Sequence, residues 1–127
     1  MHARPIEAPD APRGAGGYAQ AMLVENAHRT LYVSGQIPED REGRLPSDFG
    51  GQCRQAWANV AAQLRAAGMT LDNLVKVTTF LADRRFADEN RAIRQEVLGD
   101  RAVALTVVVV GIFDDAWLVE IEAVAGD

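Results

Sequence analysis

The sequence contains little of the chemistry on which disulfides, metal sites and membrane spans depend. One of its 127 residues is cysteine (Cys53) and two are histidine, which excludes an intrachain disulfide and offers no ligand set at metal spacing. Apolar runs such as Val107–Val110 fall far short of the roughly 20 residues that a membrane helix needs, and the N-terminus lacks a secretory apolar segment. We therefore expect a cytoplasmic protein with no metal and no membrane partner.

Positive charge is also in short supply. Thirteen Lys and Arg residues face eighteen Asp and Glu residues, which gives a formal net charge of -5, and the basic residues are dispersed along the chain. Non-specific binding to nucleic acid requires clustered Lys and Arg that neutralise phosphates. The sequence therefore argues against a nucleic-acid partner and against ribonuclease activity.

The remaining composition is that of an ordinary globular domain. The hydrophobic fraction is 48% and the charged fraction is 24%, close to average usage, and the length suffices for one core without cross-links. We expect one domain over residues 1–127. Residues 1–13 are rich in Pro and Ala and are expected to form a flexible N-terminal arm.

Apolar spacing predicts two helices. The first follows a capping residue at Ser47 or Asp48 and ends at Gly68; its apolar positions, spaced by four, four, three, one and three, are Phe49, Cys53, Trp57, Val60, Ala61 and Leu64. The second starts after Asp83 and ends near Gly99; its stripe consists of Phe86, Asn90, Ile93 and Val97. Cys53 is then a buried small hydrophobe rather than a nucleophile, and the inward Asn90 needs a hydrogen-bond partner.

Strand patterns complete the predicted order β-β-α-β-α-β-β. Residues 18–24 and 30–36 are expected to form a hairpin, and further strands are predicted at 74–82, 103–110 and 117–125. Two helices on one face of a single mixed sheet make a two-layer α+β domain. The other face would still carry Leu74, Phe80 and Leu118, so we expect it to be covered by self-association.

The last predicted strand brings two carboxylates together. Apolar residues occupy positions 117, 119, 121, 123 and 125, which leaves Glu120 and Glu122 side by side on the opposite face. A solvated strand face explains this pair, and so does a pocket in which a carboxylate handles a proton or a water molecule. Of the two, Glu122 is expected to be structural.

Several segments together resemble the RidA/YjgF (reactive intermediate deaminase) family. The resemblance spans roughly residues 14–125, and its most specific parts are Ser34-Gly35-Gln36-Ile37-Pro38 and Val119-Glu120-Ile121-Glu122, found in the family's order. It implies a chorismate-mutase-like fold and a homotrimer with ligand clefts between subunits. It also implies hydrolysis of small reactive enamines and imines to 2-keto acids and ammonia, without cofactor or metal. The residues that match the family's cleft by position are Tyr18, Ser34, Gly35, Asn90 and Glu120.

The sequence departs from the family pattern at one important point. Deaminating members carry an arginine near the start of the penultimate strand, in a Pro-Ala-Arg-x-Cys-type motif. Here Leu105 stands in its place, followed by Thr106, which could hydrogen-bond a neutral ligand, and by Val107 where the cysteine often lies. Losing one partner of a desolvated ion pair costs roughly 2 to 5 kcal/mol. Ordinary 2-imino acids should therefore bind poorly unless Arg101 or a neighbouring subunit supplies a cation.

These observations favour a hydrolase that acts on C=N bonds, in which Glu120 orients water and carries the proton. The alternative is a non-catalytic trimer that binds a small ligand or a partner protein, as a sensor or chaperone would. For the other residues the sequence leaves two interpretations open. Tyr18 offers a hydroxyl or packs, Ser34 and Gly35 contact a ligand or form a bulge, and Asn90 meets a ligand or nearby backbone.

Overall fold

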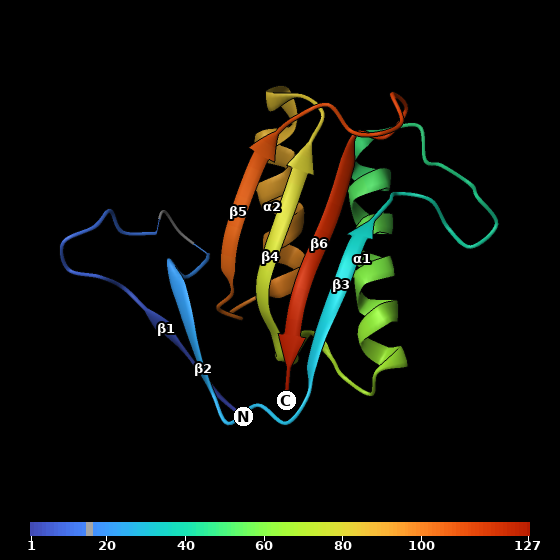
Figure 1. The fold of residues 1–127 in the computed structure, drawn as a ribbon. Helices are drawn as coiled ribbons and strands as arrows, with labels where there is room; N and C mark the ends of the chain where they lie inside the picture. Colours follow the sequence, from blue (N-terminus) through green and yellow to red (C-terminus); the bar gives the residue numbers. More distant parts are fainter. Residues whose placement is uncertain (15–16) are drawn as a thin grey trace.

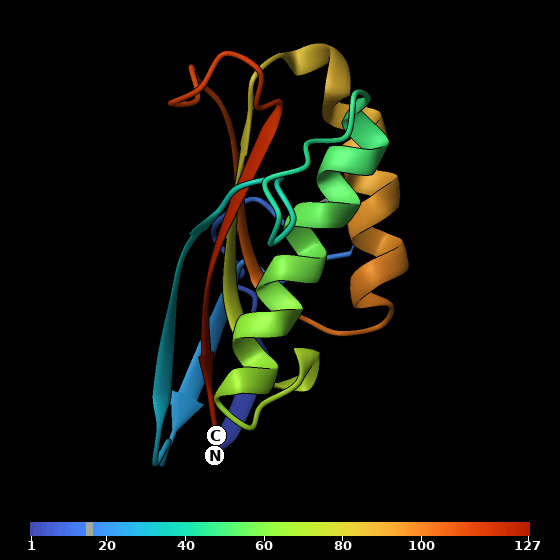
Figure 2. The same ribbon diagram turned by 90° about the vertical axis from the view of Figure 1, so that its right-hand side faces the viewer.

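The computed structural model describes residues 1–14 and 17–127, which form two layers. Two helices pack on one face of a four-stranded sheet; they lie behind the sheet in Figure 1 and on one side of it in Figure 2. The elements are β1 (His2–Ile6), β2 (Ala21–Glu25), β3 (Thr30–Gln36), α1 (Phe49–Ala66), β4 (Leu74–Leu81), α2 (Ala87–Leu98), β5 (Ala104–Val109) and β6 (Val119–Gly126). Short 3-10 turns at Leu71–Asn73 and Arg84–Phe86 precede β4 and α2.

The main sheet is mixed, with the strand order β3-β6-β4-β5. Strand β6 pairs antiparallel with both β3 and β4, whereas β4 and β5 run parallel. The parallel pair needs a crossover, which α2 supplies. The sequence therefore predicted correctly a mixed sheet with both helices on one face.

The N-terminal region corrects two predictions. Strand β2 does not form a hairpin with β3; it pairs antiparallel with β1 in a separate two-stranded sheet beyond the β5 edge (Figure 1). The single sheet of the sequence analysis is thus a four-stranded sheet plus a small one, and residues 2–6 of the expected flexible arm form a strand. The small sheet is tied to the large one at Ala19, whose N–H donates to the Val103 carbonyl at 2.8 Å.

Local capping explains where the helices begin and end. Asp48 is the N-cap of α1, and its carboxylate accepts a hydrogen bond from the Gly51 N–H at 3.2 Å. The helix ends at Ala66; Gly68 follows it with a φ of +72°, which suits glycine, and the Met69 N–H donates to the Leu64 carbonyl. Asp83 caps the short turn before α2 rather than α2 itself. No helix in the described residues is long and apolar enough to cross a bilayer.

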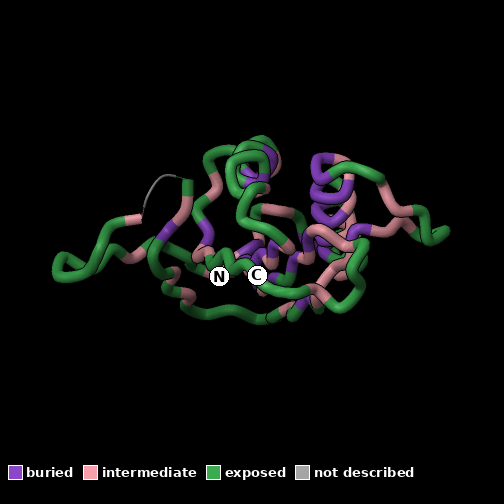
Figure 3. Tube along the Cα trace, turned by 90° about the horizontal axis from the view of Figure 1, so that it is seen from above, coloured by how far each residue is buried: buried purple, intermediate pink, exposed green. Residues whose placement is uncertain are grey.

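The core lies between the helices and the sheet (Figure 3). Trp57 is buried there as predicted, together with Leu64 of α1 and Leu81 of β4. Leu74 and Leu118, which were expected on the outer face, instead pack in or against this core. Trp117 is half-buried near the end of the loop that joins β5 to β6.

The outer face of the sheet carries no helix and displays apolar side chains. Phe80 and Val108 are paired across β4 and β5 on this face, and Tyr32 of β3 is 78% exposed. Phe113, in the loop that leads to β6, is 95% exposed. We refer to this surface as the open face. Its apolar character agrees with the expected self-association, which stays a prediction.

Candidate active site

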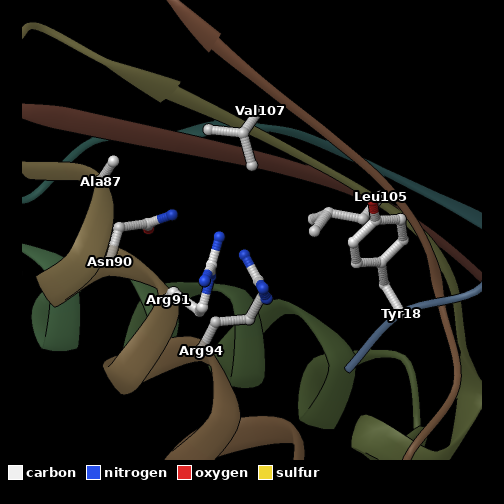
Figure 4. A pocket seen from close by; sticks show the side chains of 7 residues that line it. All are labelled: Tyr18, Ala87, Asn90, Arg91, Arg94, Leu105 and Val107. Atoms are coloured by element: carbon white, nitrogen blue, oxygen red, sulfur yellow. The ribbon is translucent and has the colours of Figure 1, made fainter. Parts of the chain in front are cut away.

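A pocket of about 310 Å³ lies between α2 and β5 (Figure 4). Its lining contains Tyr18, Ala87, Asn90, Arg91, Arg94, Leu105 and Val107. Leu105 and Val107 pair with the buried Val77 and Thr79, which places them on the helix-covered side of the sheet. The structure thus brings together four residues that the sequence analysis singled out: Tyr18, Asn90, Leu105 and Val107.

Asn90 is held in this pocket by a buried thiol. Only 2% of Asn90 is exposed, and its Oδ1 accepts a hydrogen bond from the Cys53 Sγ at 3.9 Å. The amide nitrogen points into the pocket (Figure 4). Burial raises the pKa of the Cys53 thiol to about 12, so the thiol stays protonated and serves as a donor. This confirms that Cys53 is a buried core residue, and it leaves the Asn90 NH₂ available to an acceptor.

Two arginines from α2 enter the same pocket, and the sequence analysis missed both. Arg94 is only 4% exposed, and its Nε has no hydrogen-bond partner among the described residues. Burial, followed by the nearby charge of Arg91, lowers the Arg94 pKa from its ordinary value. Ala87, Asn90, Arg91 and Arg94 are spaced by three, one and three, which is the spacing of one helical face, and this pattern is the signal that could have revealed the two arginines.

Arg101, the cation considered as a replacement for the family's arginine, is engaged elsewhere. Its Nε donates to an Asp72 carboxylate oxygen at 2.7 Å, and its terminal nitrogen donates to the Leu98 carbonyl at 3.2 Å. It does not line the pocket that contains Leu105. The positive charge of this pocket therefore comes from the helix.

Glu120 lies on the open face, against a glycine of β3. It lines a pocket of about 300 Å³ whose walls are Gly35, Phe80, Val110, Gly111, Ile112, Phe113 and Glu122. A Cβ added to Gly35 would collide with the Glu120 carboxylate and would lie 2.8 Å from its Cδ. Gly35 sits where the β3–β6 register shifts, so it is both a bulge residue and a close neighbour of Glu120.

The Glu120 carboxylate is half-buried, and its charge is not neutralised locally. Within residues 1–14 and 17–127, no Lys or Arg nitrogen lies within 4.0 Å of it, although five other ion pairs form. Such a carboxylate keeps its lone pairs available for water or for a ligand. This is the property that a proton carrier needs.

The start of β6, and hence the position of Glu120, is fixed by one buried amide. Gln52 of α1 accepts from the Leu118 N–H at 2.8 Å and donates to the Ala116 and Pro46 carbonyls at 3.1 and 3.0 Å. These bonds satisfy backbone groups of two loops that enclose the end of the sheet. The loop before β6 is therefore anchored to the helix layer.

Two other residues named in the sequence analysis, Ser34 and Thr106, line neither of these two pockets. Ser34 is exposed, and its carbonyl accepts from the Gln36 side chain at 2.9 Å. Thr106 lies on the open face, and its hydroxyl accepts from Lys76 Nζ at 2.6 Å, so it does not share the pocket of Leu105. Glu122, in contrast, is exposed opposite Thr78 and lines the same pocket as Glu120.

Within one chain, the residues predicted to share a cleft fall into two groups on opposite sides of the sheet. Glu120 and Gly35 lie on the open face, whereas Tyr18 and Asn90 lie on the helix-covered side. Across the described part of the chain, no three His, Cys, Asp or Glu side chains gather as metal ligands. The donors of the first pocket suit an organic anion, and the carboxylate of the second suits a water molecule or a proton.

Comparisons with known proteins agree with this fold and with the motifs. A family model described as endoribonuclease L-PSP matches residues 8–126. The human 2-iminobutanoate/2-iminopropanoate deaminase is 36% identical over 126 residues, covering 96% of this chain and 88% of the relative. A RutC family protein of Pyrococcus horikoshii is 35% identical over 91% of each chain.

Solved structures extend the likeness to the whole chain. The Rid family protein YyfB of Yersinia pestis, whose function is unknown, superposes with a TM-score of 0.85 at 26% identity over 100% of both chains. TdcF of E. coli with bound serine superposes with a TM-score of 0.74 at 27% identity over 98% of both. Taken with the family model, which covers nearly every residue, these relatives show that the chain belongs to the RidA/YjgF family.

Proposed function

We propose that this protein hydrolyses the C=N bond of a small reactive imine, reached directly or through its enamine tautomer, and releases ammonia. The proposal is supported by relatives named as 2-iminobutanoate/2-iminopropanoate deaminases, of which the human protein aligns with almost the whole chain. It rests on one structural observation above all. The half-buried Glu120 carboxylate is held against Gly35 in a pocket, with no cation beside it among the described residues.

The reaction requires a proton to move from water to nitrogen. The Glu120 carboxylate accepts a proton as the water oxygen attacks the imine carbon, which forms the C–O bond of a carbinolamine. The resulting carboxylic acid protonates the nitrogen, which completes the carbinolamine. Glu120 then takes the proton of the carbinolamine hydroxyl and passes it to the nitrogen, so that the C=O double bond forms as the C–N bond breaks, and a carbonyl compound and ammonia leave. One carboxylate returns to its starting state, so no cofactor is consumed.

The proposed site is shared between copies of the chain in a homotrimer. In one chain, the donors near Leu105 and the carboxylate of Glu120 lie on opposite sides of the sheet. A second copy that covers the apolar open face could bring its Glu120 toward the α2–β5 pocket of the first. Burial of Phe80, Val108 and Tyr32 would favour such an assembly.

Turnover of an imine made in place tests this function. A dehydratase generates 2-iminobutanoate from threonine, and semicarbazide traps the imine that is not hydrolysed. The wild-type protein should suppress semicarbazone formation, and Glu120→Gln should lose 100-fold or more of the rate, about the lower end of what general acid–base catalysis contributes. Glu25→Gln, which removes an exposed carboxylate of β2 outside both pockets, is the matched control for charge and should keep the rate.

The same assay separates catalysis from simple binding. A sensor or chaperone-like trimer would bind small acids yet leave semicarbazone formation unchanged, both in the wild type and in Glu120→Gln. Equal rates in the two proteins would therefore refute the proposed hydrolysis.

A further inference from the structure

The pocket between α2 and β5 offers hydrogen-bond donors with no matching acceptor. Its lining contains two guanidinium groups, the Asn90 amide and the Tyr18 hydroxyl, and it contains no Asp or Glu. The Oδ1 of Asn90 is already bound to Cys53, so the amide presents its NH₂ to the pocket. A ligand that satisfies these groups must be an acceptor with negative charge.

Arg94 is the most demanding of these donors. Four other arginines of the described chain form ion pairs near the surface: Arg29, Arg44, Arg54 and Arg101. Arg94, in contrast, is almost completely buried, its Nε has no hydrogen-bond partner, and it takes part in none of the ion pairs within 4.0 Å among the described residues. A buried charge with no partner is costly. An anionic ligand is the kind of partner that would offset this cost.

Arg94 lies across the pocket from Leu105, the position at which deaminating members of the family carry an arginine. Arg94 extends from α2 toward the space beside Leu105 and Tyr18, with Arg91 nearer to Val107 (Figure 4). Ala87, Asn90, Arg91 and Arg94 share one helical face by their spacing of three, one and three. Leu105 and Val107 form an apolar wall across from these donors. A small molecule with a carboxylate at one end and an alkyl group at the other fits both walls.

We propose that Arg94, assisted by Arg91, binds the substrate carboxylate and so replaces the cation that is absent from position 105. This inference rests on the proposed function and names its substrate class, small 2-imino carboxylates. It differs from the expectation that such acids bind poorly unless Arg101 or a neighbouring subunit supplies a cation, because here the cation comes from α2. The planar guanidinium fork sets the orientation of the carboxylate through two parallel hydrogen bonds, while Leu105 contacts the alkyl chain.

Calorimetric binding of 2-oxobutanoate, the stable keto acid, to the assembled protein tests this role separately from turnover. The wild type should bind the acid more tightly than its neutral methyl ester. Arg94→Met should weaken binding of the acid by about 30-fold or more and leave binding of the ester unchanged. Arg65→Met, which removes an exposed arginine from α1, is the matched control for net charge and should bind as the wild type does.

Relocating the cation provides the positive test. In the Arg94→Met background, Leu105→Arg should recover acid binding, because it returns a guanidinium to the same pocket from the strand side. Should Arg94→Met fail to fold, Arg94→Lys tests the same role, since it keeps the charge but loses the second hydrogen bond of the guanidinium fork. We expect about fivefold weaker binding of the acid, the net effect of one hydrogen bond.

The outcomes distinguish the two proposals. We refer to the carboxylate-binding role of Arg94 as the anchor and to the proposed C=N hydrolysis as the hydrolase. Acid binding that depends on Arg94, in a protein that shows no imine turnover, would support the anchor and refute the hydrolase. Turnover and acid binding within twofold of wild type in the Arg94 variant would reject the anchor and preserve the hydrolase. Equal wild-type affinity for acid and ester, or equal losses in Arg65→Met and Arg94→Met, would also overturn the anchor.

Discussion

The two faces of the main sheet differ in how far a single chain buries their apolar side chains and pairs their polar groups. On the helix-covered face, Trp57, Leu64 and Ile121 are buried, and Gln52 finds partners for all its polar atoms in two neighbouring loops. On the open face, Phe80 and Val108 remain partly exposed, Tyr32 is largely exposed, and no helix covers them. The first face forms a packed core within one chain, whereas the second leaves apolar side chains exposed.

The functional groups follow the same division. Anion donors collect under α2, while the proposed proton carrier lies on the uncovered side. A monomer would hold both halves of the chemistry but would not bring them together. Assembly is therefore proposed to stabilise the open face and to complete the site in one step.

The largest effect is expected from mixing two inactive proteins. Glu120→Gln and Arg94→Met should each be nearly inactive alone. If the proposed trimer forms, mixed assemblies would contain interfaces where an intact Arg94 from one chain meets an intact Glu120 from another. Joint refolding should restore imine hydrolysis to a substantial fraction of the wild-type rate, measured by semicarbazone suppression. Mixtures that stay inactive, despite mixed assembly seen by mass spectrometry, would show that the two groups act within one chain or not at all.

A smaller but still large effect is expected from Gly35→Ala. The added Cβ would overlap the Glu120 carboxylate and must displace it. Misplacing a catalytic group by about 1 Å can cost ~100-fold in rate, so kcat/KM should fall by about that factor while 2-oxobutanoate binding persists. In a Glu120→Gln background the same substitution should cost nothing further, because the group that it displaces is already inactive. Additive losses would contradict the direct collision.

The helix-covered face was largely predictable from sequence, and the reason is periodicity. The apolar spacing in 49–64 and the inward position of Asn90 predicted α1, α2 and the burial of Cys53 and Trp57, which the structure confirms. Short-range capping likewise predicted Asp48 and Gly68. These features depend on residues within a few positions of each other, which a single sequence displays.

Long-range pairing was less predictable. No short-range sequence pattern indicates that β2 pairs with β1 rather than with β3. The closeness of β2 and β3 in the sequence suggested a hairpin that does not form. The register shift that lets Leu74 face the core is equally invisible in an alternating pattern. Arg91 and Arg94 were not predicted as pocket residues because they lie on α2, close to Leu105 in space but distant from it in sequence.

Two substitutions sharpen the contrast between the faces through stability and assembly. Leu64→Ala removes a fully buried side chain and should lower the free energy of unfolding by about 2 to 5 kcal/mol, with little effect on the assembly of the folded protein.

Val108→Asp places a charge on the open face and should dissociate the assembly, so that light scattering gives the 13.8 kDa chain mass instead of a multiple of it. An assembly unaffected by Val108→Asp would remove the open face from the interface.

The smallest effect is expected in the loop after β3, which belongs to neither face. The Asp40 carboxylate accepts from the Arg44 and Glu42 N–H groups at 2.9 Å each and from Arg44 Nε at 2.7 Å. The backbone hydrogen bond from Arg44, followed by its side-chain hydrogen bond, lowers the pKa of Asp40 below its ordinary value. The contribution to stability is therefore fully present above the ordinary aspartate pKa and is lost as pH falls through the lowered one.

Asp40→Asn should reduce thermal stability only slightly at neutral pH, because surface ion pairs contribute little. The difference from wild type should shrink as the pH falls into the acid range, because the wild-type Asp40 then becomes protonated as well. Scanning calorimetry at several pH values measures this difference. Since the loop lies apart from the α2–β5 pocket and from Glu120, 2-oxobutanoate affinity and assembly mass should not change. A change in either would mean that this loop takes part in the interface, and the division into two faces would have to include a third contributing surface.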